Sequence, residues 1–468
     1  MLSARTDVVG SLLRPPELLD ALRRHDRGEL GDAEFKRIED RAVDDALALQ
    51  EDAGLEVVTD GELRRLSFQS QLPASADGFS EWSLDAFLWG EWHSEELGDL
   101  TVGRPPIAIV GKLRRRRLPS VEELAYARSR TGRILKITVP SPSLYASFYD
   151  PERAPPEYPT LEAFLEDVAD LLRDEVDELV RLGATYVQLD APQYPLLVDP
   201  AWRDFYASRG WPAERWLELG LALDNHVIGD RPGVTFGFHL CRGNQRSRWL
   251  VSGGYDWLAE RVFSSIAAER LLLEDDDERS GDFAPLARVP DGKVCVLGLV
   301  TTKSGRRETV DELAARLLDA SRYIPPERLA ISPQCGFATS VEGNSLTADD
   351  QRAKLETLVE TVELTQLYQS RGVDPDLARQ MAQGVMVDPD TALRAHAREE
   401  LGIDPDALGS PVRAAISSFC SFALGALLPL LPWFVASGAA AVIASVVLGV
   451  AGAAALGVAL ATFTKGSR

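Results

Sequence analysis

Short apolar segments alternate with amphipathic helical segments through about the first 365 residues of the chain. A period near 3.6 predicts helices, and apolar runs bounded by turn residues predict strands. The helical stretches are 16–28, 32–54, 160–183 and 347–372. The strand candidates are 56–62, 134–142, 185–192, 234–241, 270–277, 293–300 and 329–336. This alternation is typical of α/β folds with parallel strands. A strand count near eight favours a (β/α)8 TIM barrel, with a doubly wound sheet as the alternative.

One segment interrupts this alternation. Residues 80–130 are rich in tryptophan and predict an insertion, either a lid or a hairpin over the barrel mouth. The residues that carry reactive groups follow the strand candidates directly, at their carboxyl ends. In a barrel this is the face on which active sites are built.

The charge balance limits the partners of the chain. Its 468 residues carry a formal net charge of −22, which argues against nucleic acid because affinity for phosphate backbones comes from basic surfaces. The four cysteines lie far apart in the sequence, so no disulfide framework is expected. Individual thiols are therefore free for metal binding or catalysis.

A run without charged residues, from Ala414 to Phe463, occupies the C-terminal end. Because about 20 apolar residues cross a bilayer, this run predicts two transmembrane spans, about 414–435 and 439–463, with a turn between them. Basic residues bracket the run, which places both its ends, and with them the barrel, on the cytoplasmic side of a membrane. The alternative is a buried hairpin in a soluble core.

A metal-binding pattern lies in the stretch FHLC, where His239 and Cys241 are two residues apart. On a strand that spacing directs both side chains to one face. Glu274 and Cys335 lie at the ends of two further strand candidates. One imidazole, two thiolates and one carboxylate suit a tetrahedral Zn²⁺ site. The pattern alone is equally typical of a core histidine with two small buried cysteines.

Seven stretches link the first part of the chain to a known family. In order they are VGSLLRPPELL, LQEDAGLEVVTDGELRR, YVQLDAPQY, FHLCRGNQRSRW, LLLEDDDERSGDF, LGLVTTK and LAISPQCGFATS. Over about residues 5–362 the chain resembles the catalytic barrel of cobalamin-independent methionine synthase, especially its short single-barrel relatives. The resemblance implies a zinc-dependent S-methyltransferase that methylates a thiol, most directly homocysteine to give methionine.

The resemblance also implies roles for individual residues. The family's zinc ligands fall on His239, Cys241, Glu274 and Cys335. Its site for the thiol amino acid falls on Gly10, Ser11, Glu62 and Asp190. The two carboxylates of that site would hold the ammonium group of homocysteine. Structural alternatives stay open, because Asp190 would also suit a helix cap, and Glu62 an ion pair with Arg64 or Arg65.

The chain departs from the family at several points. It has Asp190-Ala191-Pro192 where the long enzymes have Asp-Glu-Pro. Lys303, in GLVTTK, stands near the position of a histidine thought to assist proton transfer, and is the candidate catalytic residue. The N-terminal barrel of the long enzymes and the tryptophan that stacks on the pterin have no clear counterpart. The methyl donor is therefore open between a methyl-folate, a methyl-corrinoid presented by a partner protein and another alkyl donor, and the acceptor thiol is open as well.

Three arginines beside FHLC have two interpretations. Arg242, Arg246 and Arg248 would receive an anionic group near the proposed zinc, because guanidinium groups match carboxylate and phosphate. They would equally pair with the acidic run 275–278. The sequence does not separate the two.

From about Leu364 the chain resembles a second family, the vacuolar-iron-transporter-like proteins that move Fe²⁺ or Mn²⁺. The matching stretches are LYQSRGVDPDLARQMAQGVM, ALRAHAREELGID and GSPVRAAISSFCSFALGALLPLLPWF. The resemblance implies a helical cytoplasmic segment at 364–410 and a membrane hairpin at 411–468, less than half of a complete transporter. His396, Glu400 and Met386 are either metal-binding side chains of that segment or solvated helix residues.

These patterns together predict a zinc methyltransferase barrel at 1–363, anchored to a membrane by its C-terminal hairpin, through which copies could self-associate. A rival prediction is a membrane protein related to Fe/Mn transporters in which the barrel is a passenger. A non-catalytic product of gene fusion is the third. Metal binding at the FHLC strand rather than at Glu400 would separate the first from the second.

Overall fold

The computed structural model describes residues 2–80, 89–103 and 109–370 of the barrel region, and residues 419, 422–423 and 425–464 near the C-terminus. Of the predicted segment 364–410, residues 371–410, with His396, Glu400 and Met386, lie outside the described residues. Residues 414–418, 420–421 and 424 of the first predicted span lie outside them as well, whereas the rest of that span is described. The chain divides into two compact units, Met1–Gly384 and Val385–Arg468. Each is described by itself.

A parallel sheet of seven strands forms the centre of the first unit, in the order β1-β6-β7-β8-β9-β10-β11. The strands are β1 Val57–Val58, β6 Ile134–Pro140, β7 Tyr186–Asp190, β8 Thr235–Leu240, β9 Arg270–Glu274, β10 Val294–Val300 and β11 Leu329–Pro333. Almost all of their residues are buried, as expected for parallel strands covered on both faces. Each strand lies within a segment predicted from the sequence.

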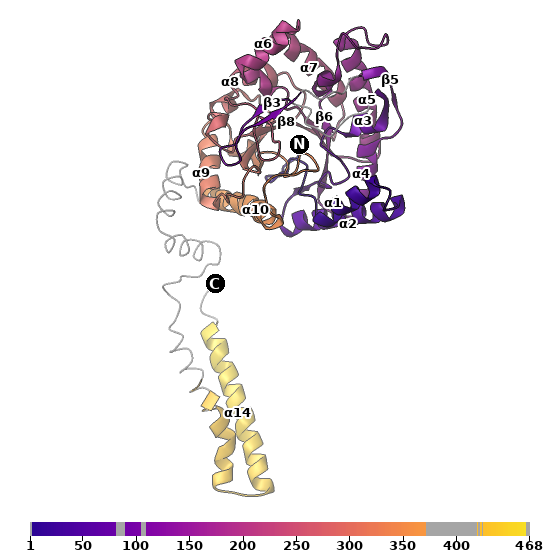
Figure 1. Ribbon diagram of the computed structural model, residues 1–468. Coiled ribbons are helices and arrows are strands. Elements are labelled where there is room, and N and C mark those ends of the chain that lie inside the picture. The colour runs from indigo at the N-terminus through magenta and orange to yellow at the C-terminus, as the bar shows by residue number, and fades with distance from the viewer. Residues whose placement is uncertain are drawn as a thin grey trace. The chain divides into compact units, whose positions relative to one another are not determined.

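The N-terminal segment joins the two edges of this sheet. On one side the Asp7 amide donates to the Ile331 carbonyl at 2.9 Å, and Thr6 pairs with Ile331 in parallel. On the other side the Leu12 amide donates to the Gly61 carbonyl at 3.0 Å, just beyond β1. The strands therefore form a ring rather than an open doubly wound sheet (Figure 1). The fold is an α/β barrel, as predicted.

Helices surround the ring of strands (Figure 1). They are α1 Pro16–Asp26, α2 Asp32–Asp52, α3 Gln71–Ser75, α4 Pro119–Ala127, α5 Leu161–Arg181, α6 Pro200–Ser208, α7 Ala213–Ile228, α8 Asp256–Leu258, α9 Val310–Ala320 and α10 Ala348–Ser370. Short 3₁₀ turns are η1 Pro142–Phe148, η2 Pro195–Val198, η4 Glu278–Ser280, η5 Ala284–Arg288 and η6 Pro326–Arg328, and η3 Ala259–Phe263 is a π-helical turn. In α5, Thr160 caps the helix by accepting from the Ala163 amide. The apolar stripe of α5 includes Val168, Leu172 and Val176, which are all buried in the main hydrophobic core.

The described part of the predicted insertion contains α4 and, together with β2 just before it, two small antiparallel pairs. They are β2 Ala76–Phe79 with β5 Ile109–Arg115, and β3 Gly90–Trp92 with β4 Leu100–Val102. The β3 strand continues into a backbone pair between His93 and Trp249, so this hairpin lies against the loop that follows β8. Trp92 is buried in a small apolar cluster with Leu144 and Leu250. Residues 81–88 and 104–108 lie outside the described part.

Asp224, on α7, is a buried carboxyl that makes the stability of the barrel depend on pH. Its Oδ2 accepts from the Tyr194 hydroxyl at 2.5 Å. Burial raises the pKa of Asp224 to about 7, although hydrogen bonds from Tyr194 and Ser141 oppose the shift. The folded chain thus keeps this proton up to about pH 7, whereas the unfolded chain releases it near pH 4. The contribution of protonated Asp224 to the stability of the folded barrel is fully present below pH 4 and is lost as the pH rises through 7.

We therefore expect Asp224→Asn to flatten part of this pH dependence. Between pH 5 and pH 8 the free energy of unfolding of the wild-type barrel should fall by roughly 3 kcal/mol more than that of the variant. Denaturant titrations of both proteins across this range measure the difference. Equal slopes would show that Asp224 ionises normally in the folded state.

The second unit is a helical hairpin. Residues 425–430 are helical, η8 spans Leu431–Phe434, and α14 spans Ala439–Thr464 after a turn that contains Gly438 in a left-handed conformation. The Ser445 hydroxyl donates to the Pro429 carbonyl across the hairpin. Apolar side chains including Ile443 and Val450 are exposed. Side chains of α14 are described as far as Ala454, and among the described residues no helix combines the length and apolar character needed to cross a membrane.

Candidate active site and metal centre

One pocket opens at the carboxyl ends of the strands and encloses about 690 Å³, its mouth to solvent included. Six residues singled out in the sequence line it: Ser11, Glu62, Asp190, His239, Cys241 and Cys335. They come from positions at or just beyond β1, β7, β8 and β11, and from the N-terminal segment. Because parallel strands of a barrel end on the same face, residues far apart in the sequence meet here.

Three of these side chains form a compact group. The candidate ligand atoms of His239, Cys241 and Cys335 all lie within 4.8 Å of one another, and all three residues are buried. His239 belongs to β8, Cys241 follows that strand directly, and Cys335 follows β11. One nitrogen and two sulfur atoms are a donor set that suits zinc.

The hydrogen bonds of His239 favour a metal at this group. Its Nδ1 lies 2.9 Å from Asp190 Oδ1, a contact in which the ring nitrogen donates to the carboxylate. Its buried Nε2 has no hydrogen-bond partner among the described residues. A buried polar nitrogen without a partner is costly, whereas a histidine oriented by a carboxylate through one nitrogen commonly binds metal through the other. The residues present therefore fit a zinc ion.

The two thiols are not equivalent. A hydrogen bond from the Cys335 thiol lowers the pKa of Cys241, against the effect of burial, and His239 lowers it further. The same hydrogen bond, together with burial, raises the pKa of Cys335. One thiolate of the pair thus forms readily, and thiolates are the form in which cysteine binds metal.

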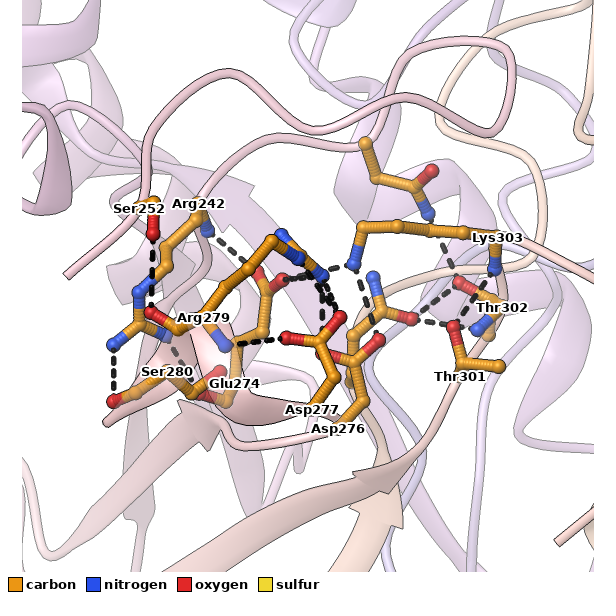
Figure 2. Close-up of polar contacts among 12 residues, drawn as sticks. Arg242, Ser252, Glu274, Asp276, Asp277, Arg279, Ser280, Thr301, Thr302 and Lys303 are labelled. Atoms are coloured by element: carbon orange, nitrogen blue, oxygen red, sulfur yellow. Dashed lines mark hydrogen bonds and ion pairs between the residues drawn. The ribbon is translucent and has the colours of Figure 1, made fainter. Parts of the chain in front are cut away.

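Glu274, the predicted fourth ligand, lies outside the group of three. It is the last residue of β9 and is fully buried. Its Oε2 accepts from the Arg242 amide at 2.6 Å and its Oε1 from Lys303 Nζ at 2.8 Å (Figure 2). Both oxygens therefore have partners within the protein. Its role as a ligand remains a prediction.

Glu62 is held in an unusual backbone conformation. Its φ of 55° is left-handed, a region that costs energy for a residue other than glycine and is found preferentially at functional sites. Its amide donates to Asp60 Oδ1 at 2.9 Å, and Thr138 Oγ1 donates to its Oε1 at 2.6 Å. Arg65 lies 3.4 Å from the same oxygen, so the ion pair considered from the sequence is present. Burial raises the pKa of Glu62.

Gly10 and Ser11 pack directly against the pocket. A Cβ at Gly10 would lie 2.4 Å from Glu62 Oε1, so only glycine allows the Glu62 carboxylate its position. A Cβ at Gly336 would similarly lie 2.0 Å from Ser11 Oγ. Gly10 thus shapes the pocket without lining it.

Asp190 connects the pocket to a buried polar chain inside the barrel. Its Oδ1 accepts from Gln188 Nε2 at 2.7 Å as well as from His239. Gln188 Oε1 in turn accepts from Lys136 Nζ at 2.6 Å, and Lys136 pairs with Asp7 at 2.9 Å. The Asp190 side chain therefore orients His239 rather than capping a helix.

Lys303 lies beside Glu274 and does not line the pocket. It borders a separate polar cleft together with Asp276 and Arg279. Burial opposes its charge, but the carboxylates of Asp276 and Glu274 raise its pKa above the ordinary value. Lys303 is therefore a charged partner of Glu274. Its side chain does not line the pocket, so a catalytic role through direct contact with molecules bound there is not supported.

The three arginines after FHLC are engaged in the protein itself. Arg242 is buried and donates to the carbonyls of Gly253, Glu274 and Ser280. Arg246 pairs with Glu342, and Arg248 donates to the carbonyls of Gly98 and Leu97. The acidic run 275–278 pairs instead with Arg279 and Lys303, two cations that were not predicted from the sequence to be its partners (Figure 2).

The pocket also contains residues that sequence reasoning missed. Phe68, Gln69, Trp92 and Asn244 line it. Asn244 Nδ2 donates to Thr302 Oγ1 at 2.9 Å and to the Gly336 carbonyl at 3.0 Å, which fixes the loop that carries Cys335. The tryptophan-rich insertion was the one available signal for Trp92. Asn244 lies in the matching stretch FHLCRGNQRSRW, whereas nothing in the sequence distinguishes Phe68 and Gln69 from ordinary loop residues.

A barrel with a pocket at its strand ends is the architecture of a barrel enzyme, and the buried His-Cys-Cys group in this pocket could hold a metal ion. The chain belongs to the family of cobalamin-independent synthase catalytic domains, whose model matches residues 4–361. The model of the VIT family matches residues 338–468, so the two matches overlap along α10.

Relatives by sequence agree with this family. The chain is 32% identical over 359 residues to the uncharacterized protein YxjH of Bacillus subtilis, an overlap of 76% of this chain and 93% of that protein. It is 28% identical over 333 residues to methionine synthase of Pyrococcus abyssi, an overlap of 71% of this chain and 86% of that protein. It is 28% identical over 337 residues to the 5-methyltetrahydropteroyltriglutamate–homocysteine methyltransferase of Rhodococcus jostii, covering 71% of this chain and 40% of that one.

The fold is shared with two solved structures. The putative vitamin-B12-independent methionine synthase of Listeria monocytogenes superposes with a TM-score of 0.57 at 24% identity, over 77% of this chain and 97% of that one. The B12-independent methionine synthase of a Shewanella species, in complex with selenomethionine, superposes with a TM-score of 0.58 at 18% identity, over 78% of this chain and 98% of that one.

Proposed function

We propose that this protein is a zinc-dependent methyltransferase that transfers a methyl group to the sulfur of homocysteine to give methionine. The observation that carries the proposal is the group of His239, Cys241 and Cys335, with an unpartnered Nε2, in the pocket of a cobalamin-independent synthase barrel. The names of the relatives from Pyrococcus abyssi and Rhodococcus jostii support the choice of acceptor.

His239, Cys241 and Cys335 would hold the metal, with Glu274 as a fourth ligand. A bound zinc ion supplies one chemical property, since it lowers the pKa of a thiol that binds to it so that the thiolate predominates at neutral pH. The protein contributes the orientation of His239 through Asp190, and the burial that excludes water from the sulfur atoms.

Glu62, Asp190 and Ser11 would hold the amino-acid part of the acceptor. Two buried carboxylates in one pocket attract an ammonium group, and a hydroxyl can donate to the acceptor's carboxylate. The left-handed backbone at Glu62 and the close contact with Gly10 fix this carboxylate before the acceptor binds. In the transfer the bond from donor to methyl breaks as the carbon–sulfur bond forms. The proton lost by the thiol balances the one that a folate leaving group takes up, and it passes to solvent when the leaving group is a corrinoid.

The methyl donor is the least constrained part of the proposal. A methyl-folate agrees with the name of the Rhodococcus jostii relative, of which this chain covers 40%. A methyl-corrinoid presented by a partner protein is the second candidate, because the match to that relative does not extend over the rest of its length. Both donors belong in the first assay.

For the C-terminal unit we propose a membrane anchor with spans at about 414–435 and 439–463 and with the barrel on the cytoplasmic side. Support comes from the charge-free run, from the helical hairpin at residues 425–464 and from the VIT family match. Alkaline carbonate washing of membranes tests this directly, because an inserted protein stays with the membrane pellet and a peripheral one is released.

The catalytic proposal is tested with the full-length chain, purified in detergent and loaded with zinc. Homocysteine is supplied with carbon-13-methyl-labelled 5-methyltetrahydrofolate, as the monoglutamate and the triglutamate, or with labelled methylcobalamin. We expect labelled methionine with one of these donors and none from zinc-free protein. Zinc-loaded protein that binds homocysteine and yet forms no methionine with any donor would contradict the proposal and favour the passenger or fusion alternatives.

A further inference from the structure

We propose that Lys136, in the interior of the barrel, is a positioning residue for the metal group that acts through Gln188 and Asp190. This inference rests on the proposed function, since His239 serves as a ligand only if the pocket holds a metal. Lys136 itself does not line the pocket. Its effect reaches His239 through three hydrogen bonds, in which Gln188 and Asp190 are the intermediate residues.

Lys136 lies in β6 and its side chain is completely buried. Its Nζ donates to three acceptors, which are Asp7 Oδ1 at 2.9 Å, Gln188 Oε1 at 2.6 Å and the Val8 carbonyl. A lysine has three N–H groups only as an ammonium ion. The arrangement therefore requires the charged form, although burial lowers the pKa of Lys136. A buried charge of this kind persists only where its partners are in place.

The Gln188 side chain, in β7, is held in one orientation by its contacts. Its Oε1 faces the Lys136 ammonium group, which can only donate, so the NH₂ group must occupy the other end of the amide. This Nε2 donates to the Val9 carbonyl at 2.9 Å and to Asp190 Oδ1 at 2.7 Å. Gln188 is fully buried, and both ends of its amide are satisfied within the barrel.

Asp190 transmits this orientation to the metal group. Its Oδ1 accepts from Gln188 and also from His239 Nδ1, which lies 2.9 Å away. The two meet because β7 pairs with β8 in a register that places Asp190 opposite His239. The position of the carboxylate sets the plane of the imidazole ring and leaves its Nε2 for a metal. Gln188 therefore acts on the metal group without contact to it.

Loss of the Lys136 ammonium group would release this path. In Lys136→Met the Gln188 Oε1 atom would be a buried acceptor without a donor, which is costly. The amide would turn toward another donor, and its bond to Asp190 would weaken. Methionine has nearly the length of lysine and adapts well to its surroundings, so the exchange creates little empty space.

The rest of the buried charge cluster keeps its partners in this variant. Asp7 Oδ2 accepts from the Tyr186 hydroxyl at 2.7 Å, and Arg270 lies 3.3 Å from the same oxygen. Asp7 would therefore remain paired with a cation after Lys136 is replaced. Breaking a buried ion pair is most damaging when it leaves an isolated charge, and that situation is avoided here.

The first test measures the zinc affinity of the full-length chain by competition with a chromophoric chelator. We expect Lys136→Met to weaken zinc binding about tenfold, because His239 is then less firmly oriented. Loss of a positive charge would by itself tighten the binding of a cation, so a weaker affinity reports the hydrogen-bonded path. Lys354→Met removes another buried lysine, which pairs with Glu308 outside the pocket, and should stay within about twofold of the wild type.

A double-mutant cycle with Asp190→Ala separates positioning from general damage to the barrel. Asp190→Ala cuts the path at its last step and should weaken zinc binding about 30-fold. If Lys136 acts through Asp190, the double variant should also stay near about 30-fold, whereas independent effects would multiply to about 300-fold. Multiplied losses would overturn the inference, as would an unchanged or tighter zinc affinity of Lys136→Met.

A second variant keeps the inference testable if Lys136→Met does not fold. Gln188→Met cuts the same path and leaves Lys136 paired with Asp7, and it should weaken zinc binding about tenfold. An unchanged affinity of Gln188→Met would overturn the inference. Absence of zinc from the wild-type group of three would instead remove the proposed function, whereas normal zinc binding without an effect of either variant would remove only this inference.

Discussion

Replacement of Cys335 by serine is expected to reduce zinc from about one ion per chain to a trace and to slow methyl transfer strongly. Cys335 supplies one of only two sulfur atoms in the group, and its thiol also donates to Cys241. Loss of the metal removes several kcal/mol of stabilisation of the reacting sulfur, so kcat/KM should fall by about three orders of magnitude. Metal analysis of the purified protein and the methionine assay measure the two effects.

Cys295 provides a matched control for this substitution. It is a fully buried cysteine in β10, outside the pocket, and burial raises its pKa to about 12. Cys295→Ser should keep its zinc and its activity per folded molecule. If both serine variants lost zinc equally, the loss would reflect damage to the barrel, and the assignment of Cys335 as a ligand would fail.

Substitution of Asp190 by asparagine is expected to have two separable effects. The variant keeps the shape of the side chain but weakens the bond to His239 Nδ1, so zinc affinity should fall by about tenfold. It also removes a negative charge that would face the ammonium group of the acceptor, so kcat/KM for homocysteine should fall by a further factor of about 100.

An acceptor without an amino group distinguishes the two effects. The compound 4-mercaptobutyrate has the chain and carboxylate of homocysteine but no ammonium group. With zinc held saturating, Asp190→Asn should lose little activity toward this thiol while it loses about 100-fold toward homocysteine. Equal losses with both acceptors would show that Asp190 acts only through His239 and does not bind the acceptor.

The sequence predicted the barrel because its strands are buried on both faces and therefore read as continuous apolar runs. The segment that closes the barrel was not recognised as a strand, and the reason is physical. Residues 5–7 are Arg-Thr-Asp, and Asp7 is the centre of a buried charge cluster with Lys136 at 2.9 Å and Arg270 at 3.3 Å. A strand that contributes charges to the barrel interior carries no apolar pattern.

The part of the candidate site that could be predicted from the sequence consists of residues placed at the carboxyl ends of strands. The two-residue spacing in FHLC and the position of Cys335 after β11 bring three ligand atoms together through strand geometry alone. The orientation of Glu274 was not predictable, because it depends on a backbone amide and on a lysine 29 residues away. Contacts of this kind are specified by the packing of three loops and leave no periodic signal.

Zinc-edge X-ray absorption of the full-length protein, with and without homocysteine, tests the central claim most directly. The account predicts two sulfur ligands in the resting protein, from Cys241 and Cys335, and a third sulfur when homocysteine is added. The same measurement with methionine should leave the count at two. A sulfur count that homocysteine does not change, in protein that holds zinc and binds the amino acid, would contradict the thiolate mechanism.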